Sequence, residues 1–520
     1  MTHNVTAATR LFDTLPLLAC DPRIRIVFTR TGSSAFDSGT AEFLARHGVE
    51  SIPWAEAVRR EFDLAISASY GGDLHELRSP LIVVPHGMGY NKILGNSAFG
   101  LSAEWLMHDG AVIPSAIVLS HAEQRERLRS ACPPAEPKAV VAGDICFDRL
   151  RASHGLRPSY RRAFGLSGGR KLVVISSTWG PHALLDTAPD LPLRLAEQLP
   201  VDEFALLLAP HPNIVAGHSS WQFGELLAAA KRAGVTVPDD VDAWRAAIVA
   251  ADLVVGDHGS VSFYSTALGN PLILASAPTH TVDPNSPVAQ LLATAPVLDP
   301  HGDLHRQVRD AIATHDPNHY SAITALTTSE PDASPAILRT LMYRTLELTE
   351  PTEPAELSAL PLPTVTLTVP ESYLAVVRVD AEGVAHLTRF PAERLRAPDS
   401  TPRGAHLVIG VTEPRRRWLQ LADVVVGVSG PGPRRWITDT LAGLPGLLLA
   451  ATPTESGRWW FGDRSGTMLS ASGDARACRS FASIACHHLS RGKRLAELGG
   501  EWRIDCAGRT YSLVVAPSTV

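Results

Sequence analysis

Histidine, lysine and small hydroxyl residues recur in this chain at points where apolar runs end. His86-Gly87 follows the apolar run 81–84, and Lys92 closes the same motif. Imidazole is the side chain best suited to take up a proton near neutral pH. In open α/β folds ligands bind at the carboxyl ends of the strands, where this histidine would lie. His86 is therefore a candidate for proton transfer, although for this residue taken alone an ordinary loop or capping role is the favoured interpretation.

Further polar segments also follow apolar runs. They are Ser176-Ser177-Thr178-Trp179 after 171–176, His211-Pro212-Asn213 after 204–208, and Asp257-His258-Gly259-Ser260 after 252–255; Gly143-Asp144 through Leu150 lies where the pattern changes over. Carboxyl ends of parallel strands meet at one edge of a sheet. Together these segments predict one ligand-binding cleft.

The segment 256–271, GDHGSVSFYSTALGNP, has the pattern of an anion site. A strand, a glycine-containing loop and a helix follow one another, and Gly259 lets the main chain approach a ligand. Ser260 could cap the helix and donate from its hydroxyl. A helix N-terminus carries about half a positive charge, which suits a diphosphate. An ordinary capped helix is the alternative interpretation.

Composition limits the classes of function. The length of 520 residues predicts about two to four domains. A hydrophobic content of 45%, a charged content of 19% and a formal net charge of −6 indicate a globular protein that binds no nucleic acid through a broad basic surface. The arginine clusters 415–417 and 434–435 could contact anions, but a solvated face is the favoured interpretation.

No secretion signal or apolar run of transmembrane length is evident, so we expect a cytoplasmic protein with at most peripheral contact at the inner face of the membrane. The six cysteines are scattered without a CxxC pair, which is typical of reduced thiols. Cys486-His487-His488 is not expected to bind metal, because adjacent residues point in different directions. We predict no metal site and no cofactor.

Apolar runs alternate with helical stretches along most of the chain. Strands are expected at 24–28, 62–67, 81–84, 116–119, 171–176, 204–208, 252–255 and 272–275, and helices at 40–47, 122–128, 221–233, 243–250 and 261–268. This order predicts an α/β fold of two tandem Rossmann-like, doubly wound domains with a C-terminal α/β segment. We expect an acceptor domain at 1–155, a nucleotide-diphosphate-binding domain at 156–345, a Pro-rich linker at 346–370 and a module of unknown role at 371–520.

One internal similarity connects the second domain with the C-terminal module. ADLVVGDHGS (251–260) with TALGNPLILASAPT (266–279) is similar to ADVVVGVSG (422–430) with TLAGLPGLLLAATPT (440–454). A degenerate duplication and convergence on a common strand–Gly–helix pattern both explain it. In a duplication the second copy has lost the Asp-His pair.

In order and spacing these motifs resemble those of the CDP-glycerol glycerophosphotransferases, the teichoic-acid-polymerase-like enzymes of the two-domain GT-B architecture. The His-Gly motif ending in Lys is similar to His86-Gly87 with Lys92, and the glycine-containing element before Asp-x-Leu is similar to 143–150. The family's Ala-Pro-Thr-aromatic, His-Pro and Asp-Tyr-Ser-Ser motifs are similar to 176–179, 211–212 and 257–260. The resemblance covers about residues 80 to 280.

The chain departs from the family's pattern at several positions. His258 stands in place of the tyrosine and Gly259 in place of the first serine, so one hydroxyl contact to the diphosphate is absent. The middle of the His-Gly motif, 88–91, is unusual for the family, so the family's acceptor does not carry over from this motif. Residues 371–520 have no counterpart in the family.

The resemblance implies a transferase that moves a glycerophosphate-like (phospho-alcohol) group from a CDP-linked donor to an acceptor hydroxyl. It implies His86 and His211 as catalytic residues and Gly87 and Lys92 as acceptor contacts. The implied donor site consists of Ser177, Thr178, His211, Asp257, His258, Gly259 and Ser260. Asp257 is expected to orient its loop, because a carboxylate repels a diphosphate. The alternative for Lys92 is that its side chain faces solvent and does not contact the acceptor.

The expected partners are a nucleotide-activated small-molecule donor and a hydroxyl acceptor, which is a polyol phosphate, a glycan or a lipid-linked group. One alternative is a GT-B glycosyltransferase or a sugar-nucleotide epimerase-like enzyme, with Glu203 and Asp283 as the nearby acids. A second is a catalytically silent nucleotide-binding or scaffold protein, for which the lost serine and the large C-terminal module are the support.

Overall fold

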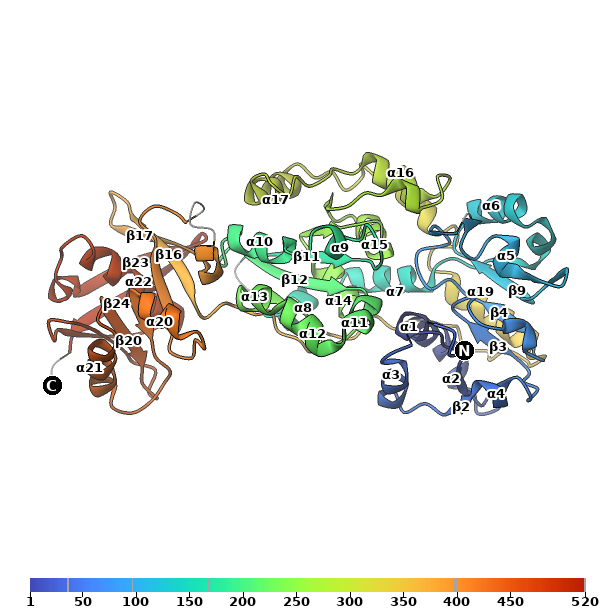
Figure 1. Cartoon of the computed structure of the whole chain (residues 1–520), viewed down its shortest axis with the longest axis horizontal. Coiled ribbons are helices and arrows are strands. Elements are labelled where there is room, and N and C mark those ends of the chain that lie inside the picture. Colours follow the sequence, from blue (N-terminus) through green and yellow to red (C-terminus); the bar gives the residue numbers. More distant parts are fainter. Residues whose placement is uncertain (35–36, 96, 167–168, 397–400, 519–520) are drawn as a thin grey trace.

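A computed structural model describes the chain except for residues 35–36, 96, 167–168, 397–400 and 519–520. The chain forms three units that follow one another in sequence order, the first at the right of Figure 1 and the third at the left. Within the described residues, no helix has both the length and the apolar character needed to cross a bilayer.

The first unit is built on parallel strands. Its four-stranded sheet has the order β10 (Ala139–Val141), β9 (Ala116–Leu119), β4 (Leu81–Val83), β3 (Ala65–Ser67), and β1 (Phe28–Arg30) pairs separately with β2 (Ser51–Pro53). Every residue of β4 and β9 is buried, as expected for strands covered on both faces. The other elements are α1 (Val5–Thr14), α2 (Pro16–Ala19), α3 (Thr40–Arg46), α4 (Trp54–Ala57), β5 (Ile93–Leu94), β6 (Ser97–Ala98), α5 (Ala103–Leu106), β7 (Met107–His108), β8 (Ala111–Val112), α6 (Glu123–Ala131) and α7 (Ile145–His154).

The strand predicted at 24–28 is wrong in its bounds, because β1 starts only at Phe28. Arg25 lies in the expected strand and forms a surface ion pair with Glu50 at 2.6 Å, so its side chain points to solvent. Ile24 and Ile26 are only partly buried, and residues 24–27 form no strand.

The second unit is a doubly wound domain around a five-stranded parallel sheet. The strand order is β13 (Val235–Thr236), β12 (Phe204–Pro210), β11 (Lys171–Ser177), β14 (Leu253–Gly256), β15 (Leu272–Leu274). Successive residues of β11 belong to two different cores, Leu172 and Val174 to one and Val173 and Ile175 to the other, so both faces are covered. Its helices are α8 (Arg157–Ala163), α9 (Leu184–Thr187), α10 (Leu191–Gln198), α11 (Pro212–His218), α12 (Ser220–Leu226), α13 (Ala228–Arg232), α14 (Ala243–Ala250), α15 (Ser260–Ala267), α16 (Pro287–Thr294), α17 (Leu304–Ala313) and α18 (Ser321–Thr324).

The chain then returns to the first unit through α19 (Ser334–Thr345), whose residues were expected to belong to the second. Leu338, Leu341 and Met342 share a core with α1. Asp148 of α7 accepts the main-chain N–H groups of Asp332 (2.9 Å) and Ser334 (3.3 Å). The two crossings between the units therefore lie side by side, and the motif 143–150 has a structural task at their junction.

The predicted linker 346–370 has neither helix nor strand after residue 347, yet it is packed on the second unit. Leu360 and Leu367 are buried. Tyr160 of α8 donates its hydroxyl hydrogen to the Leu360 carbonyl at 2.7 Å, and the Leu367 N–H bonds the Phe164 carbonyl at 3.0 Å. The segment is thus a strap along α8.

The C-terminal module is a closed nine-stranded barrel, which corrects the expected α/β segment. The strand order is β16 (Tyr373–Val379), β17 (Val384–Pro391), β23 (Gly500–Cys506), β24 (Arg509–Pro517), β22 (Met468–Ser472), β21 (Trp459–Asp463), β20 (Leu449–Pro453), β19 (Val424–Val426), β18 (His406–Gly410). Only β18, β19 and β20, with α20 (Arg416–Leu421) and α21 (Pro433–Gly443), form a parallel α/β portion. Helix α22 (Ala475–Leu489) packs against strands all around the sheet, and its Cys486 is fully buried.

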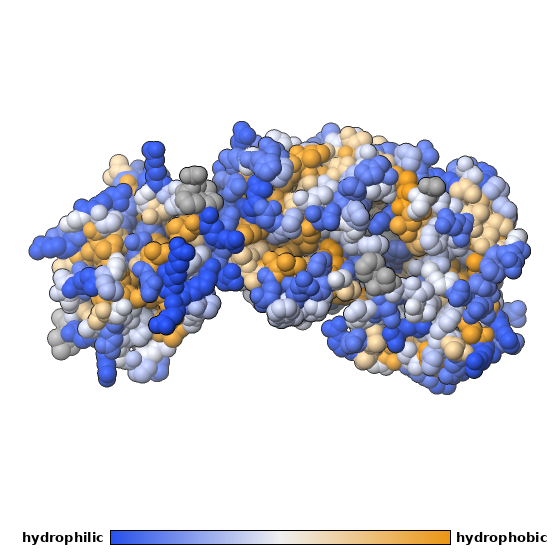
Figure 2. All heavy atoms as spheres, viewed as in Figure 1, coloured by the Kyte–Doolittle hydropathy of each residue, from blue (hydrophilic) through white to orange (hydrophobic). Residues whose placement is uncertain are grey.

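The arginine clusters of this module are mostly solvated. Arg416 and Arg417 are exposed, and Figure 2 shows a strongly hydrophilic surface over α20. Arg415 instead pairs with Glu413 at 2.6 Å and Glu393 at 3.0 Å. The predicted solvated face therefore describes Arg416 and Arg417 but not Arg415.

The two similar sequence segments fold alike. Each forms a strand–helix–strand unit with parallel strands, β14–α15–β15 and β19–α21–β20. The first strand of each unit also pairs in parallel with a preceding strand, and the equivalent residues Leu253 and Val424 oppose Val173 of β11 and Val408 of β18. Asp252 accepts the main-chain N–H of Leu172 and Asp423 that of Leu407, both at 2.7 Å. The two units share a frame and differ in the loop between strand and helix.

Removing the Asp423 carboxylate should destabilise the barrel. Asp423→Ala leaves the Leu407 N–H without its acceptor inside the sheet, a loss of about 1–3 kcal/mol. The thermal unfolding midpoint should fall relative to wild type. Asp439→Ala on exposed α21 is the matched control and should leave the midpoint unchanged; an equal effect of both would contradict the assignment.

Candidate functional site

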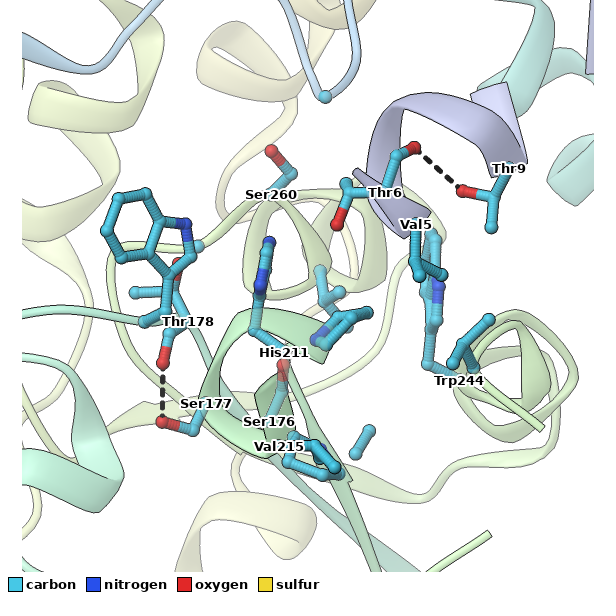
Figure 3. Close-up of a pocket in the computed structure, with 18 of the residues that line it drawn as sticks. Val5, Thr6, Thr9, Ser176, Ser177, Thr178, His211, Val215, Trp244 and Ser260 are labelled. Carbon is cyan, nitrogen blue, oxygen red and sulfur yellow. Dashed lines mark hydrogen bonds between the residues drawn. The ribbon is translucent and has the colours of Figure 1, made fainter. Parts of the chain in front are cut away.

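A cavity of about 570 Å³ lies between the first and second units. Its walls contain the segments 86–92 and part of α1 from the first unit, and 176–179, 209–212 and 258–261 from the second. Every residue predicted for the site lines this cavity except Asp257. Figure 3 shows Ser176, Ser177, Thr178, His211 and Ser260 facing the α1 residues Val5, Thr6 and Thr9.

The sheet order explains why the second unit contributes these loops. The strand order reverses direction between β11 and β14, so the connections after the two strands leave to opposite faces. The crevice at such a switch point is where doubly wound sheets bind ligands. Ser177-Thr178-Trp179 follows β11 and Asp257-His258-Gly259-Ser260 follows β14, so both loops border this crevice.

Asp257 holds the two loops together from behind the cavity wall. Its Oδ2 accepts the N–H groups of Thr178 (2.8 Å) and Leu184 (2.9 Å), and its Oδ1 accepts that of Gly259 (3.0 Å). Burial raises the pKa of this carboxyl to about 6, although the three hydrogen bonds act in the opposite direction. Both oxygens serve the protein's own main chain, so Asp257 orients the loops.

Gly259 and Ser260 join the loops and the units. A Cβ at Gly259 would lie 3.1 Å from the Thr178 Cβ, so a side chain there would press against the loop after β11. The expected helix cap is wrong: α15 begins at Ser260 with Gly259 as its N-cap, and no side chain caps it. The Ser260 Oγ instead accepts the N–H of Met88 at 3.1 Å, which ties the loop after β14 to the segment 86–92 of the first unit.

His211 is a neutral hydrogen-bond donor facing the cavity. Its Nδ1 accepts the N–H of Asn213 at 3.1 Å, which leaves the proton on Nε2. Burial lowers the pKa of this imidazole to about 3, and the positive potential of His86 and Lys92 acts in the same direction. Figure 3 shows the ring between Thr178 and the side of the cavity formed by α1.

His86 is also neutral and can therefore accept a proton. Burial lowers its pKa to about 4, and the charge of Arg10 lowers it further. A hydrogen bond to the backbone of Ala68 acts in the opposite direction. The ring meets Phe99 edge-on, with centroids 5.9 Å apart.

Lys92 faces the cavity rather than solvent, so the solvent alternative is wrong. Its Nζ lies 4.0 Å from the centroid of the Trp179 ring. Burial lowers the pKa of the ammonium, and the carboxylate of Asp257 raises it. Lys92 thus brings positive charge from the first unit to the loops of the second.

The other residues predicted to bind the nucleotide-linked donor differ in whether their polar atoms already form hydrogen bonds within the protein. The Ser177 Oγ accepts the Leu185 N–H at 3.0 Å and donates to the Thr178 carbonyl at 2.9 Å, so this hydroxyl serves its own loop. His258 is 8% exposed and its buried Nδ1 has no hydrogen-bond partner among the described residues. Burial lowers the pKa of His258 to about 4.

The sequence analysis missed the contribution of α1. Thr6, Thr9 and Arg10 line the cavity, and the Arg10 Nε donates to the His86 carbonyl at 3.1 Å. The available signal was local: Asn4 caps the helix by accepting the Ala7 N–H. Nothing in the sequence brings α1 next to residue 86.

Among the described residues, no group of three or more His, Cys, Asp or Glu side chains is arranged to hold a metal ion. Lys92 and Arg10 line the cavity and bring positive charge to it.

No family model matches the chain, and no curated protein matches it in sequence. Solved structures similar to it include the wall teichoic acid polymerase TagF soaked with CDPG, at 12% identity over 66% of this chain and 86% of that one, with a TM-score of 0.46. MnaA of S. aureus with UDP is 11% identical over 69% and 98%, with a TM-score of 0.42. The UDP-GlcNAc 2-epimerase of Neisseria meningitidis bound to UDP-GlcNAc is 11% identical over 66% and 98%, with a TM-score of 0.40.

Asp257→Asn should reveal the ionisation of this carboxyl in the stability of the protein. Because the pKa in the fold is raised to about 6, ionising Asp257 between pH 4 and pH 6 makes the native state less stable, by at most about 3 kcal/mol. Asparagine loses hydrogen bonds at every pH but avoids this ionisation. The variant should therefore be destabilised less at pH 7.5 than at pH 4.5, as measured by chemical denaturation. An equal loss at both pH values would show that the carboxyl titrates normally.

Proposed function

We propose that the protein is a transferase that moves a glycerophosphate-like group from a CDP-linked donor to an acceptor hydroxyl. The observation that carries this proposal is the composition of the cavity, where His86 and Lys92 of one unit face His211 and Ser260 of the other. The order of the motifs, which resembles the CDP-glycerol glycerophosphotransferases, supports the choice of donor.

The second unit supplies groups that suit a diphosphate. The His211 Nε2–H and the Ser260 hydroxyl hydrogen are available to donate, since their other hydrogen-bonding positions are used within the protein. The N-terminus of α15 adds positive potential at the same place, and Lys92 adds charge from across the cavity. These groups would also stabilise the charge on the leaving CMP.

His86 would act as the general base. It takes the proton of the acceptor hydroxyl, whose oxygen bonds to the β-phosphorus while the bond from that phosphorus to the bridging oxygen breaks. CMP leaves with the electron pair of that bond. Burial lowers the pKa of His86, and a bound diphosphate would raise it because negative charge favours the imidazolium.

A glycosyl-transferring or epimerase-like enzyme is the second candidate, and one feature favours it. Asp239, Asp240 and Asp242 line the cavity, where carboxylates could bind sugar hydroxyls. The acids expected from the sequence do not line the cavity: Glu203 borders a different pocket, and Asp283 pairs with Arg127 at 3.0 Å.

Nucleotide binding separates these candidates. We expect cytidine nucleotides to raise the thermal unfolding midpoint when CDP, CMP, UDP, GDP and ADP are compared at saturation. A ligand at a hundred times its Kd adds about 2.7 kcal/mol of stability. A shift with UDP or GDP alone would favour glycosyl transfer, and no shift with any nucleotide would favour the silent scaffold.

His86→Ala should abolish turnover and leave nucleotide binding nearly unchanged, because the imidazole is proposed to act on the acceptor. Turnover is followed as CMP release from CDP-glycerol with glycerol phosphate oligomers as acceptor, and binding as the thermal shift with CDP. His154→Ala, an exposed histidine outside the cavity, is the control and should behave as wild type. Loss of CDP binding in the His86 variant would refute the assignment of a base.

A further inference from the structure

We propose that Arg10 is a positioning residue that fixes the His86 loop and ties it to the second unit through Asp13. This inference rests on the proposed role of His86, because a fixed loop matters most if that imidazole reacts. Arg10 lies on α1, 7% exposed, in the wall of the cavity.

Arg10 holds the main chain of the reactive loop directly. Its Nε donates to the carbonyl oxygen of His86 at 3.1 Å, and its Nη1 lies 3.3 Å from the Asp13 Oδ2. The planar guanidinium fixes the angle between its donors, so anchoring one side orients the other. The place of His86 is thus linked to the place of Asp13.

Asp13 in turn forms ion pairs with residues of both units. It is fully buried as a side chain, and its Oδ1 lies 2.6 Å from Arg149 of α7 and 2.6 Å from Arg245 of α14. Three guanidinium groups hold the pKa of this carboxyl below its usual value although burial alone would raise it. Since α14 is part of the second unit, the Asp13–Arg245 pair exists only while the two units are together.

Two aromatic rings of the second unit pack against the Arg10 guanidinium. Its guanidinium carbon lies 5.8 Å from the Trp244 ring centroid and 5.7 Å from that of Tyr264. Tyr264 is on α15, the helix that starts at the donor loop, and its hydroxyl donates to the Asp144 Oδ2 at 2.6 Å. Arg10 therefore contacts the same helix that carries Ser260 at its start.

The His86 loop is consequently held at two successive points. Arg10 binds the carbonyl of His86, and Ser260 accepts the N–H of Met88. A Cβ at the intervening Gly87 would lie 2.6 Å from the Ser260 Oγ, so the loop and the donor helix meet without space between them. The Ser260 anchor comes from the second unit, and the Arg10 anchor packs against Trp244 and Tyr264 of that unit, so the second unit contributes to the placement of the His86 loop.

The charge of Arg10 offers a direct readout at His86. The charged groups that act on this imidazole are Arg10, Lys92 and the neighbouring histidines His3 and His211. Arg10 is the first of them after burial itself in lowering the pKa of His86. Replacing Arg10 by a neutral residue should therefore raise that pKa, whereas a mere loss of stability elsewhere should not.

The test compares three variants of the full chain. Arg10→Gln removes the charge, Arg10→Lys keeps the charge but loses the Nε donor, and Arg149→Gln removes another partner of Asp13 that does not line the cavity. Histidine Cε1 signals are titrated by NMR, with His86 assigned by its loss in His86→Ala. Turnover and the CDP-induced thermal shift are measured on the same samples.

We expect Arg10→Gln to raise the pKa of His86 and to lower kcat about tenfold to a hundredfold, with the CDP shift retained. Arg10→Lys should keep the low pKa and still lose kcat, which a purely electrostatic role would not produce. Arg149→Gln should leave the His86 titration as in wild type. If Arg149→Gln shifts the pKa and lowers kcat as much as Arg10→Gln does, the network only stabilises the fold and the inference is overturned.

The titration also separates this inference from the proposed function. If wild type turns over no donor, the transferase proposal fails, and the NMR comparison of Arg10→Gln with Arg149→Gln still decides whether Arg10 acts on His86. An unchanged His86 pKa in Arg10→Gln overturns the inference even where turnover is found.

Discussion

The geometry of the cavity depends on one buried carboxylate. Asp257 bonds the main chain after β11, at the start of α9 and after β14, so a single side chain fixes both loops at the switch point. No ligand group is needed for that arrangement, because the three N–H donors come from the protein itself. The loops are therefore organised before a substrate arrives, and preorganised donors are those that stabilise developing charge most effectively.

Around this frame the histidines of the cavity are neutral near pH 7. Burial lowers the pKa of His86, His211 and His258, while it raises that of Asp257. Burial also lowers the pKa of the Lys92 ammonium, which lies over the aromatic ring of Trp179. A cavity with several neutral donors and few fixed charges changes its protonation when an anion enters, since each phosphate charge favours the protonated imidazoles.

Much of the second unit and the strand-end loops of the cavity could be predicted from the sequence, because apolar runs mark buried parallel strands and polar residues at their ends share one edge. Ser177 shows the limit of that reasoning: it lies at the edge, but its hydroxyl serves the protein's own main chain. Asp257, expected to orient its loop, accepts main-chain N–H groups of both loops. The contribution of Arg10, the return of α19 and the barrel depend on contacts between distant segments, for which local periodicity holds no signal. Within the barrel the parallel strand–helix–strand pattern is limited to β18, β19 and β20, and the interpretation of the whole module followed that portion. The other parallel pair, β17 with β23, joins strands that lie far apart in the sequence.

The crossings of the chain between the first two units limit how these units can move relative to one another. The chain passes between them after α7 and again before α19, and Asp148 fastens the second passage to the first. The chain crosses a third time after α19, where the strap 346–370 runs from the first unit to α8 of the second. Three connections of one chain link the two units, so any relative motion of the units has to be taken up by backbone dihedral angles within these short segments.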